Sequence, residues 1–217
     1  ICGQWIVDGE VTFLSGDTNT CKSTVAHGLA RAISDGSNFL GYPTKVCEVL
    51  YAETEMTSKQ LYNRFKDVNV NDNFKYLDSV GKDLTWILEQ VESYCKAREC
   101  DKRLVVVIDS ISVAARSSIT AKVARETMQR LKAMCKLYGI SVLVLVHNKK
   151  RDKKKPLQLS DIQGSGKLMD MADNAAKMGT PIENIQNAYQ GFAKQNYTML
   201  DNLKLGYGGT KTEMERL

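Results

Sequence analysis

The sequence predicts an α/β domain in which helices cover both faces of a mostly parallel central sheet. Segments rich in apolar and β-branched residues alternate with segments in which apolar residues recur every three or four positions. Two apolar segments, residues 104–108 and 140–146, are continuous runs, which is typical of strands buried on both faces. Strands that alternate with helices usually pair in parallel, because each helix carries the chain back across the sheet.

The first half of the chain contains three expected strands and three expected helices. Residues 11–14 are a short apolar run, and residues 45–51 and 74–77 are rich in β-formers, so all three are expected to be strands. The intervening helices are expected over residues 23–33, 59–68 and 83–97, where apolar side chains recur at helical spacing.

The second half continues the alternation and then loosens. The continuous runs predict strands over residues 104–109 and 140–146, with a helix over 121–137 between them. After Pro156 the pattern is weaker, and strands are expected near residues 174–178, 190–195 and 203–206. The sequence shows no repeat or linker, so we expect residues 1–217 to form a single domain.

Composition excludes several classes of protein. Of the 217 residues, 43% are hydrophobic and 25% are charged, as in ordinary globular domains, and no apolar run is long enough to span a bilayer. The first residues show no secretory leader. Six cysteines are scattered without C-x-x-C spacing, which favours reduced thiols and a cytoplasmic protein without a membrane partner.

A phosphate-binding loop lies between the first strand and the first helix. The pattern G-x-x-x-x-G-K-[ST] uses backbone N–H groups to hold phosphates, the lysine to contact the β and γ phosphates, and the hydroxyl to bind Mg²⁺. The corresponding residues are Gly16, Asp17, Thr18, Asn19, Thr20, Cys21, Lys22 and Ser23. Cys21 replaces the second glycine, so we expect ATP to bind more weakly than it would to a glycine variant.

A second acid is expected to complete a magnesium site. Asp109 ends the buried run 104–108, where it could hold the metal through water while Ser23 supplies its hydroxyl. Both features also occur by chance, because an acid can simply terminate a core strand. Their combination, each on the appropriate type of element, favours a site for ATP and Mg²⁺.

Four motifs in order resemble the RecA-like P-loop ATPases, and in particular the RepA-type and DnaB-type hexameric helicase cores. The motifs are the loop from Gly16 to Ser23, the Glu-Met pair at Glu55, the Val-Ile-Asp-Ser segment ending at Ser110, and a strand that ends in His147. The resemblance covers roughly residues 3–195. It implies a homo-oligomer, such as a hexamer, that couples ATP to single-stranded DNA in replication, recombination or the maintenance of a mobile element.

The resemblance also implies roles for individual residues. Glu55 is in register with the family's catalytic glutamate, and Glu53 is the second choice, two positions earlier on the same face of an extended strand. Either acid could instead complement the dipole of the helix that follows. His147 occupies the position of a polar residue that senses the γ-phosphate, although a lone histidine can also be purely structural. The other histidine, His27, has no such position.

A basic segment follows the last continuous strand. Its six cations are Lys149, Lys150, Arg151, Lys153, Lys154 and Lys155. They could contact the phosphates of single-stranded DNA, or they could form a solvated loop.

One departure from the family leaves the extent of hydrolysis open. The usual Lys-x-Arg finger is absent after Lys194, and Lys194 itself is out of register. A degenerate, nucleotide-gated binding module without significant turnover is therefore the alternative to a DNA-dependent ATPase. A small-molecule phosphotransferase is less favoured, because the sequence shows no arginine-rich lid.

Overall fold

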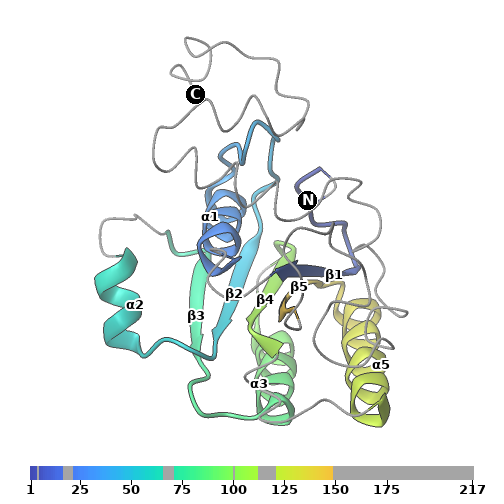
Figure 1. The fold of residues 1–217 in the computed structure, drawn as a ribbon. Helices are drawn as coiled ribbons and strands as arrows, with labels where there is room; N and C mark the ends of the chain where they lie inside the picture. Colours follow the sequence, from blue (N-terminus) through green and yellow to red (C-terminus); the bar gives the residue numbers. More distant parts are fainter. Residues whose placement is uncertain (4, 17–21, 66–70, 100, 112–120, 149–217) are drawn as a thin grey trace.

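The computed structural model describes residues 1–3, 5–16, 22–65, 71–99, 101–111 and 121–148. Within these residues the elements alternate between strand and helix, as the sequence predicts (Figure 1). The strands are β1 (Val11–Gly16), β2 (Glu48–Glu53), β3 (Phe74–Asp78), β4 (Leu104–Asp109) and β5 (Ser141–His147). The helices are α1 (Lys22–Asp35), α2 (Ser58–Phe65), α3 (Leu84–Ala97) and α5 (Ala121–Tyr138).

The described strands form one parallel sheet with the order β1-β5-β4-β2-β3. Strands β2, β4 and β5 lie inside the sheet. Strand β4 is buried at every position, which explains its continuous apolar run. Among the described strands β3 pairs only with β2, and it is partly exposed, as is usual for an edge strand. The fold class is therefore confirmed.

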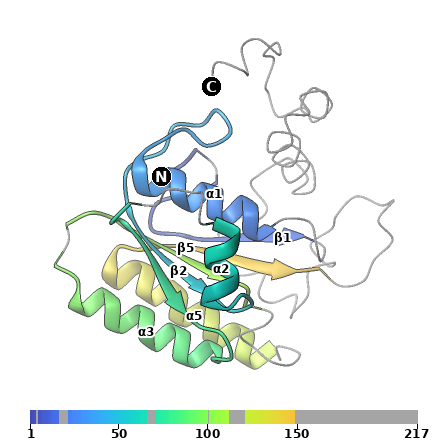
Figure 2. The same cartoon turned by 90° about the vertical axis from the view of Figure 1, so that its left-hand side faces the viewer.

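Helices cover both faces of the sheet. Figure 2 shows α1 on one side and α3 and α5 on the other. Each face has its own core: α3 and α5 pack on residues such as Val106 and Ile108, whereas α1 packs on Val105 and Val107. Because successive residues of a strand point to opposite faces, a single buried strand serves both cores.

The helix starts carry local signals that the sequence contains. Asp83 caps α3, since its side chain accepts a hydrogen bond from the backbone N–H of Trp86 at 2.8 Å. At α2, Thr57 and Gln60 form a reciprocal capping arrangement in which the Gln60 side chain accepts from the Thr57 backbone N–H at 2.9 Å.

Some predicted boundaries were wrong. The second strand was expected over residues 45–51 but spans Glu48–Glu53, because the backbone of Lys45 and Cys47 bonds to Ile1 and Ile33 outside the sheet. The strands expected at 174–178, 190–195 and 203–206 lie outside the described residues, as does the end of the helix expected over 59–68.

The described cysteines agree with the expectation of reduced thiols. Cys2, Cys47, Cys95 and Cys135 are buried, and none of these four forms a disulfide. Burial raises the pKa of the Cys2 thiol to about 11, which keeps it protonated and unreactive near neutral pH. None of the described helices is long and apolar enough to cross a membrane.

Candidate active site

The carboxyl ends of four strands bring the predicted site residues to one edge of the sheet. Strand pairing places Gly16 beside His147 and Glu53 beside Asp109. These pairs come from four strands, with β5 and β4 adjacent between β1 and β2. Side chains that are far apart in sequence therefore meet at the edge where parallel α/β sheets usually bind ligands.

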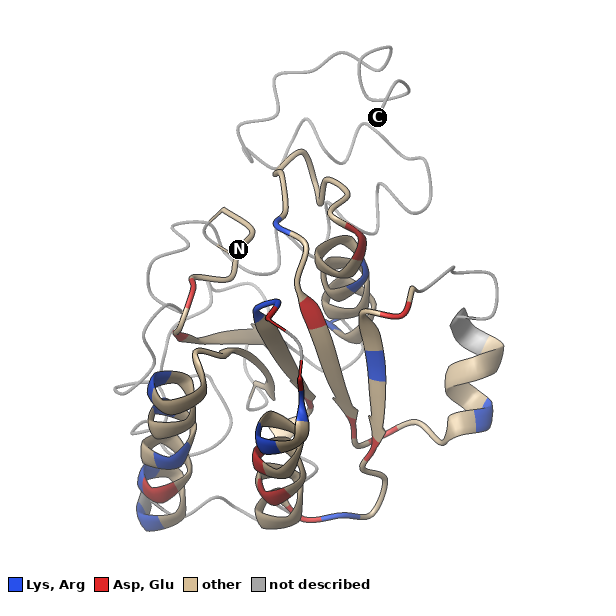
Figure 3. Ribbon diagram, turned by 180° about the vertical axis from the view of Figure 1, so that it is seen from behind, with Lys and Arg blue, Asp and Glu red and all other residues tan. Residues whose placement is uncertain are grey.

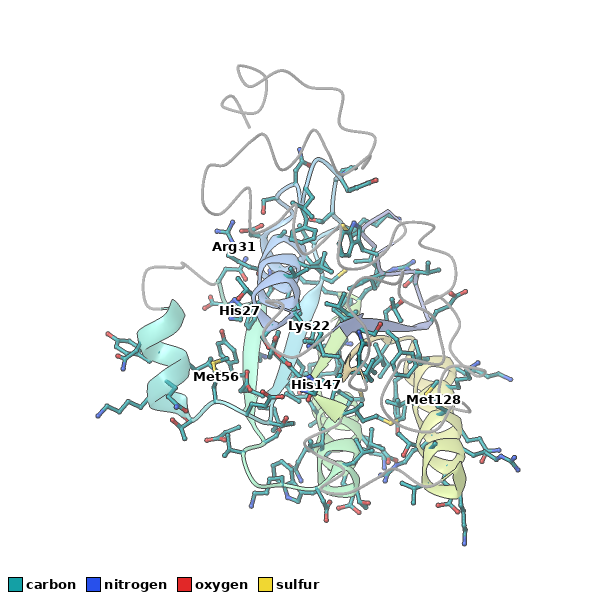
Figure 4. The ribbon with its side chains drawn as sticks, in the orientation of Figure 1. Lys22, His27, Arg31, Met56, Met128 and His147 are labelled. Carbon is teal, nitrogen blue, oxygen red and sulfur yellow. The ribbon has the colours of Figure 1, made fainter. Side chains whose placement is uncertain are left out.

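Lys22 and Ser23 begin α1 next to this edge. Lys22 is only 5% exposed, and its positive charge acts to lower the pKa of both Asp109 and Glu55. The hydroxyl of Ser23 is hydrogen-bonded to the Asp109 carboxylate. Figure 4 shows Lys22 and His147 toward this same end of the sheet. The other predicted loop residues, Asp17, Thr18, Asn19, Thr20 and Cys21, lie outside the described residues.

Asp109 is almost completely buried and is held from two sides. The hydroxyl of Tyr51 donates a 2.7 Å hydrogen bond to its Oδ2, in addition to the contact with Ser23. Burial raises the pKa of Asp109, while the bonds from Tyr51 and Ser23 and the charge of Lys22 oppose that rise. A cation at this position would favour the ionised carboxylate.

Asp109 and Ser23 fit a magnesium site. A carboxylate and a hydroxyl are hard oxygen donors, and because burial raises the pKa of this carboxylate, a cation beside it would stabilise the ionised form. The described residues contain no cluster of three or more His, Cys, Asp or Glu side chains suited to hold a metal ion. The pair Asp109 and Ser23 suits Mg²⁺ by its own chemistry, because Mg²⁺ usually takes one or two protein oxygen ligands together with substrate phosphates.

Glu55 lies beside this pair and is partly open to solvent. Its Oε1 accepts a hydrogen bond from the Ser110 hydroxyl at 3.0 Å and lies 3.1 Å from Nε2 of His147. The contact with His147 is the largest cause of a lowered pKa at Glu55, against the opposing effect of burial. Because an ionised carboxylate can only accept, Nε2 of His147 carries the proton in this contact. With 40% of its side chain exposed, Glu55 can contact a water molecule.

Glu53 differs from Glu55 although the two are only two residues apart. The prediction that both lie on the same face of an extended strand was wrong, because β2 ends at Glu53 and the chain bends over Thr54–Met56. Glu53 is 3% exposed, and its Oε1 accepts the backbone N–H groups of Glu55 at 2.8 Å and Met56 at 3.0 Å. Burial, together with the nearby charge of Asp109, raises the pKa of Glu53 to about 7.

Neither acid serves as the side-chain cap of α2. Thr57 and Gln60 perform that role, whereas Glu53 holds the preceding bend and Glu55 points to Ser110 and His147. Figure 3 shows acidic residues at the ends of β2, β3 and β4. The geometry favours Glu55 over Glu53 as the residue able to contact a reactant.

Sequence reasoning missed three residues that shape the site. Tyr51 holds Asp109, Ser110 holds Glu55, and Thr54 joins the two strands at their ends. A signal existed for Tyr51, since a tyrosine within a fully buried strand needs a partner for its hydroxyl. His27 is buried, its ring lies 5.5 Å from that of Tyr51, and it is hydrogen-bonded to Tyr76. These contacts place His27 in the core under the site.

The predicted nucleic-acid residues cannot be placed in this geometry. Lys149, Lys150, Arg151, Lys153, Lys154 and Lys155 follow β5 directly in sequence but lie outside the described residues.

Two kinds of comparison place the chain among known proteins. The family model described as "AAA domain" matches residues 1–153. Among solved structures, one described as an ATPase domain is similar, with a TM-score of 0.59, 17% identity, and coverage of 77% of this chain and 68% of that one.

A second solved structure is described as a DnaB-like replicative helicase and its interactions with primase. It matches with a TM-score of 0.58 and 17% identity, covering 76% of this chain and 47% of that one, so this chain spans about half of its length. At this level of identity the likeness concerns the fold. The chain therefore belongs to the AAA domain family and has the RecA-like P-loop ATPase fold seen in DnaB-like helicases.

Proposed function

We propose that this protein binds and hydrolyses ATP and couples that reaction to single-stranded DNA in replication, recombination or mobile-element maintenance. The observation that carries the proposal is the arrangement at the sheet edge. An ionised, half-exposed Glu55 lies beside the buried pair Asp109 and Ser23, with Lys22 close enough to influence the pKa of both acids. Family membership and fold support the same activity.

The nucleotide would be held by the start of α1. Lys22 is the candidate to contact the β and γ phosphates, and the first turn of a helix presents backbone N–H groups to an anion. Ser23 and Asp109 would hold Mg²⁺, which when bound neutralises phosphate charge. Tyr51 keeps the Asp109 carboxylate oriented toward Ser23, because its 2.7 Å bond fixes one carboxylate oxygen.

Glu55 would orient and deprotonate the attacking water. Its lowered pKa keeps it ionised at neutral pH, and the hydrogen bonds from Ser110 and His147 fix one of its oxygens. Its exposed fraction leaves room for water at the other oxygen. His147 contacts Glu55 and lies beside Gly16, where the phosphate loop begins, so it is placed to respond to the terminal phosphate.

The partners belong to the same proposal. The six cations between Lys149 and Lys155 would neutralise DNA phosphates, since they follow β5 and His147 directly along the chain. The proposal includes assembly into a homo-oligomer, such as a hexamer, and a cytoplasmic location, which the likeness to helicase domains supports.

The test is Mg²⁺-dependent ATP turnover with and without single-stranded DNA. We expect turnover that DNA stimulates and that Glu55→Gln abolishes. Glu89→Gln is the matched control, because Glu89 is an exposed glutamate on α3 and is not one of the residues assigned to the site. Equal turnover in the Glu55→Gln and wild-type proteins would contradict the role of Glu55.

A nucleotide-gated binding module is the alternative to an ATPase. Cys21 in the phosphate loop and the missing Lys-x-Arg finger favour it. A folded protein that binds ATP and DNA without turnover would establish this alternative.

A further inference from the structure

The bend after β2 determines where Glu55 lies, and a single side-chain oxygen holds much of it. Oε1 of Glu53 accepts two backbone N–H groups, those of Glu55 at 2.8 Å and Met56 at 3.0 Å. Two such bonds to one oxygen fix the direction in which the Glu55 backbone leaves the strand.

The other side of the bend is attached to β4. The backbone N–H of Thr54 donates to the Asp109 carbonyl at 2.8 Å, and its hydroxyl donates to the same oxygen at 2.9 Å. The hydroxyl of Thr54 also accepts the Ser110 N–H at 2.9 Å. Thr54 therefore anchors the start of the bend, and Glu53 holds its continuation, so that Glu55 reaches Ser110 and His147.

Packing alone does not explain this arrangement. Glu53 and Met56 line a pocket of about 390 Å³ that also borders β3 and α2. The bend consequently has open space on one side, where close-packed side chains would otherwise restrict it. The polar contacts of Glu53 and Thr54 therefore help to define its conformation.

We propose that Glu53 is a positioning residue whose carboxylate oxygen holds Glu55 in its reactive geometry. This inference rests on the proposed function, because it assigns Glu55 the catalytic step. Glu53 itself is 3% exposed and one of its oxygens is occupied by backbone groups, whereas 40% of the Glu55 side chain is exposed. The two neighbouring acids thus have separate roles.

Two substitutions of similar length separate the acceptor from the charge. Glu53→Gln removes the charge and keeps a carbonyl oxygen that can accept from Glu55 and Met56. Glu53→Met also removes the charge and fills a similar volume, but it has no comparable acceptor. The comparison between them therefore reports the hydrogen bonds alone.

The first measurement is steady-state ATP turnover of the whole chain, together with the affinity for a fluorescent, non-hydrolysable ATP analogue. We expect Glu53→Met to lower kcat by about 10- to 100-fold, the scale expected when a reacting group is displaced by about 1 Å. Analogue affinity should stay within about twofold, because Lys22 and Ser23 are untouched. Glu53→Gln should retain most of the wild-type kcat. Equal activity of the two variants, whether high or low, would overturn the proposal.

The second measurement does not depend on hydrolysis. Amide hydrogen exchange in the segment from Glu53 to Thr57 should be slow in wild type and Glu53→Gln and at least about tenfold faster in Glu53→Met. Asp83→Ala, which removes the cap of α3 and none of the contacts of Glu53, controls for general loss of stability. If wild type lacks turnover, the proposed function fails, and exchange alone decides the role of Glu53. Equal exchange rates in Glu53→Met and Glu53→Gln would then overturn the positioning role of Glu53.

Discussion

Replacing Glu53 by glutamine should change how the stability of the protein depends on pH. The pKa of Glu53 is raised from its ordinary value of 4.5 to about 7, first by burial and then by the charge of Asp109. The folded protein therefore keeps a proton on Glu53 that the unfolded chain has already released. Where the folded state binds more protons, the free energy of unfolding falls as pH rises. The stabilising contribution of this proton is fully present below the pKa that Glu53 has in the unfolded chain. It is lost as pH rises through the higher pKa that Glu53 has in the folded protein.

The size of the effect follows from the difference between the two pKa values. A rise from 4.5 to about 7 corresponds to about 3 kcal/mol when the group is fully ionised. Between about pH 5 and about pH 8 roughly 2 kcal/mol of this loss should develop, since part has already occurred at the lower pH. Glu53→Gln does not ionise, and its amide keeps an acceptor for Glu55 and Met56. The free energy of unfolding of Glu53→Gln should therefore not show this loss. Between the lower and the higher pH, the stability of Glu53→Gln relative to wild type should rise by about 2 kcal/mol.

Urea unfolding of both proteins at the two pH values, with EDTA and without nucleotide, measures this difference. Every other titrating group occurs in both proteins and cancels to first order, although Asp109 will titrate more easily once its charged neighbour is gone. Glu55→Gln gives the opposite sign as a control: the lowered pKa of Glu55 makes wild type the more stable protein above the ordinary carboxyl range. The same pH dependence in wild type and Glu53→Gln would refute the reasoning.

Three further substitutions test the contacts around the sheet. Tyr51→Phe removes the 2.7 Å bond to buried Asp109 and should lower the free energy of unfolding by about 1–3 kcal/mol, measured in urea; an unchanged value would show that Asp109 is held by other groups. Asp83→Ala removes the cap of α3 and should cost about 1 kcal/mol in thermal unfolding while ATP turnover is retained. Leu131→Ala, in the core under α5, should cost about 2–5 kcal/mol, and a cost near zero would contradict its burial at 1% exposure.

The sequence predicted the sheet because its inner strands are buried on both faces. Aliphatic side chains predominate at such positions in β4 and β5, so these strands appear as continuous runs that have few other interpretations. The boundary of β2 was less predictable. Residues 45–47 resemble a strand in composition, but their backbone groups bond to Ile1 and Ile33, which no local pattern indicates.

The site was predictable where it depends on strand ends and unpredictable where it depends on the bends that follow. Asp109 and His147 each end a buried strand, so parallel pairing brings them to the same edge. The roles of Glu53 and Glu55 depend instead on Thr54, which contacts Asp109 and Ser110. These contacts join residues that are more than 50 positions apart in the sequence, at separations of 55 and 56. Spacing along a strand gave no information about a segment that is no longer a strand.

The different environments of the two acids follow from their positions relative to the end of the sheet. Glu53 is the last residue of β2 and is paired with Asp109, so its side chain is buried beside another carboxylate and its pKa rises. Glu55 lies beyond the ladder, where it meets Ser110 and His147 and its pKa falls. The pairing of Glu53 with Asp109 is therefore the structural reason why one carboxylate is available to a reactant and the other to the backbone that holds it.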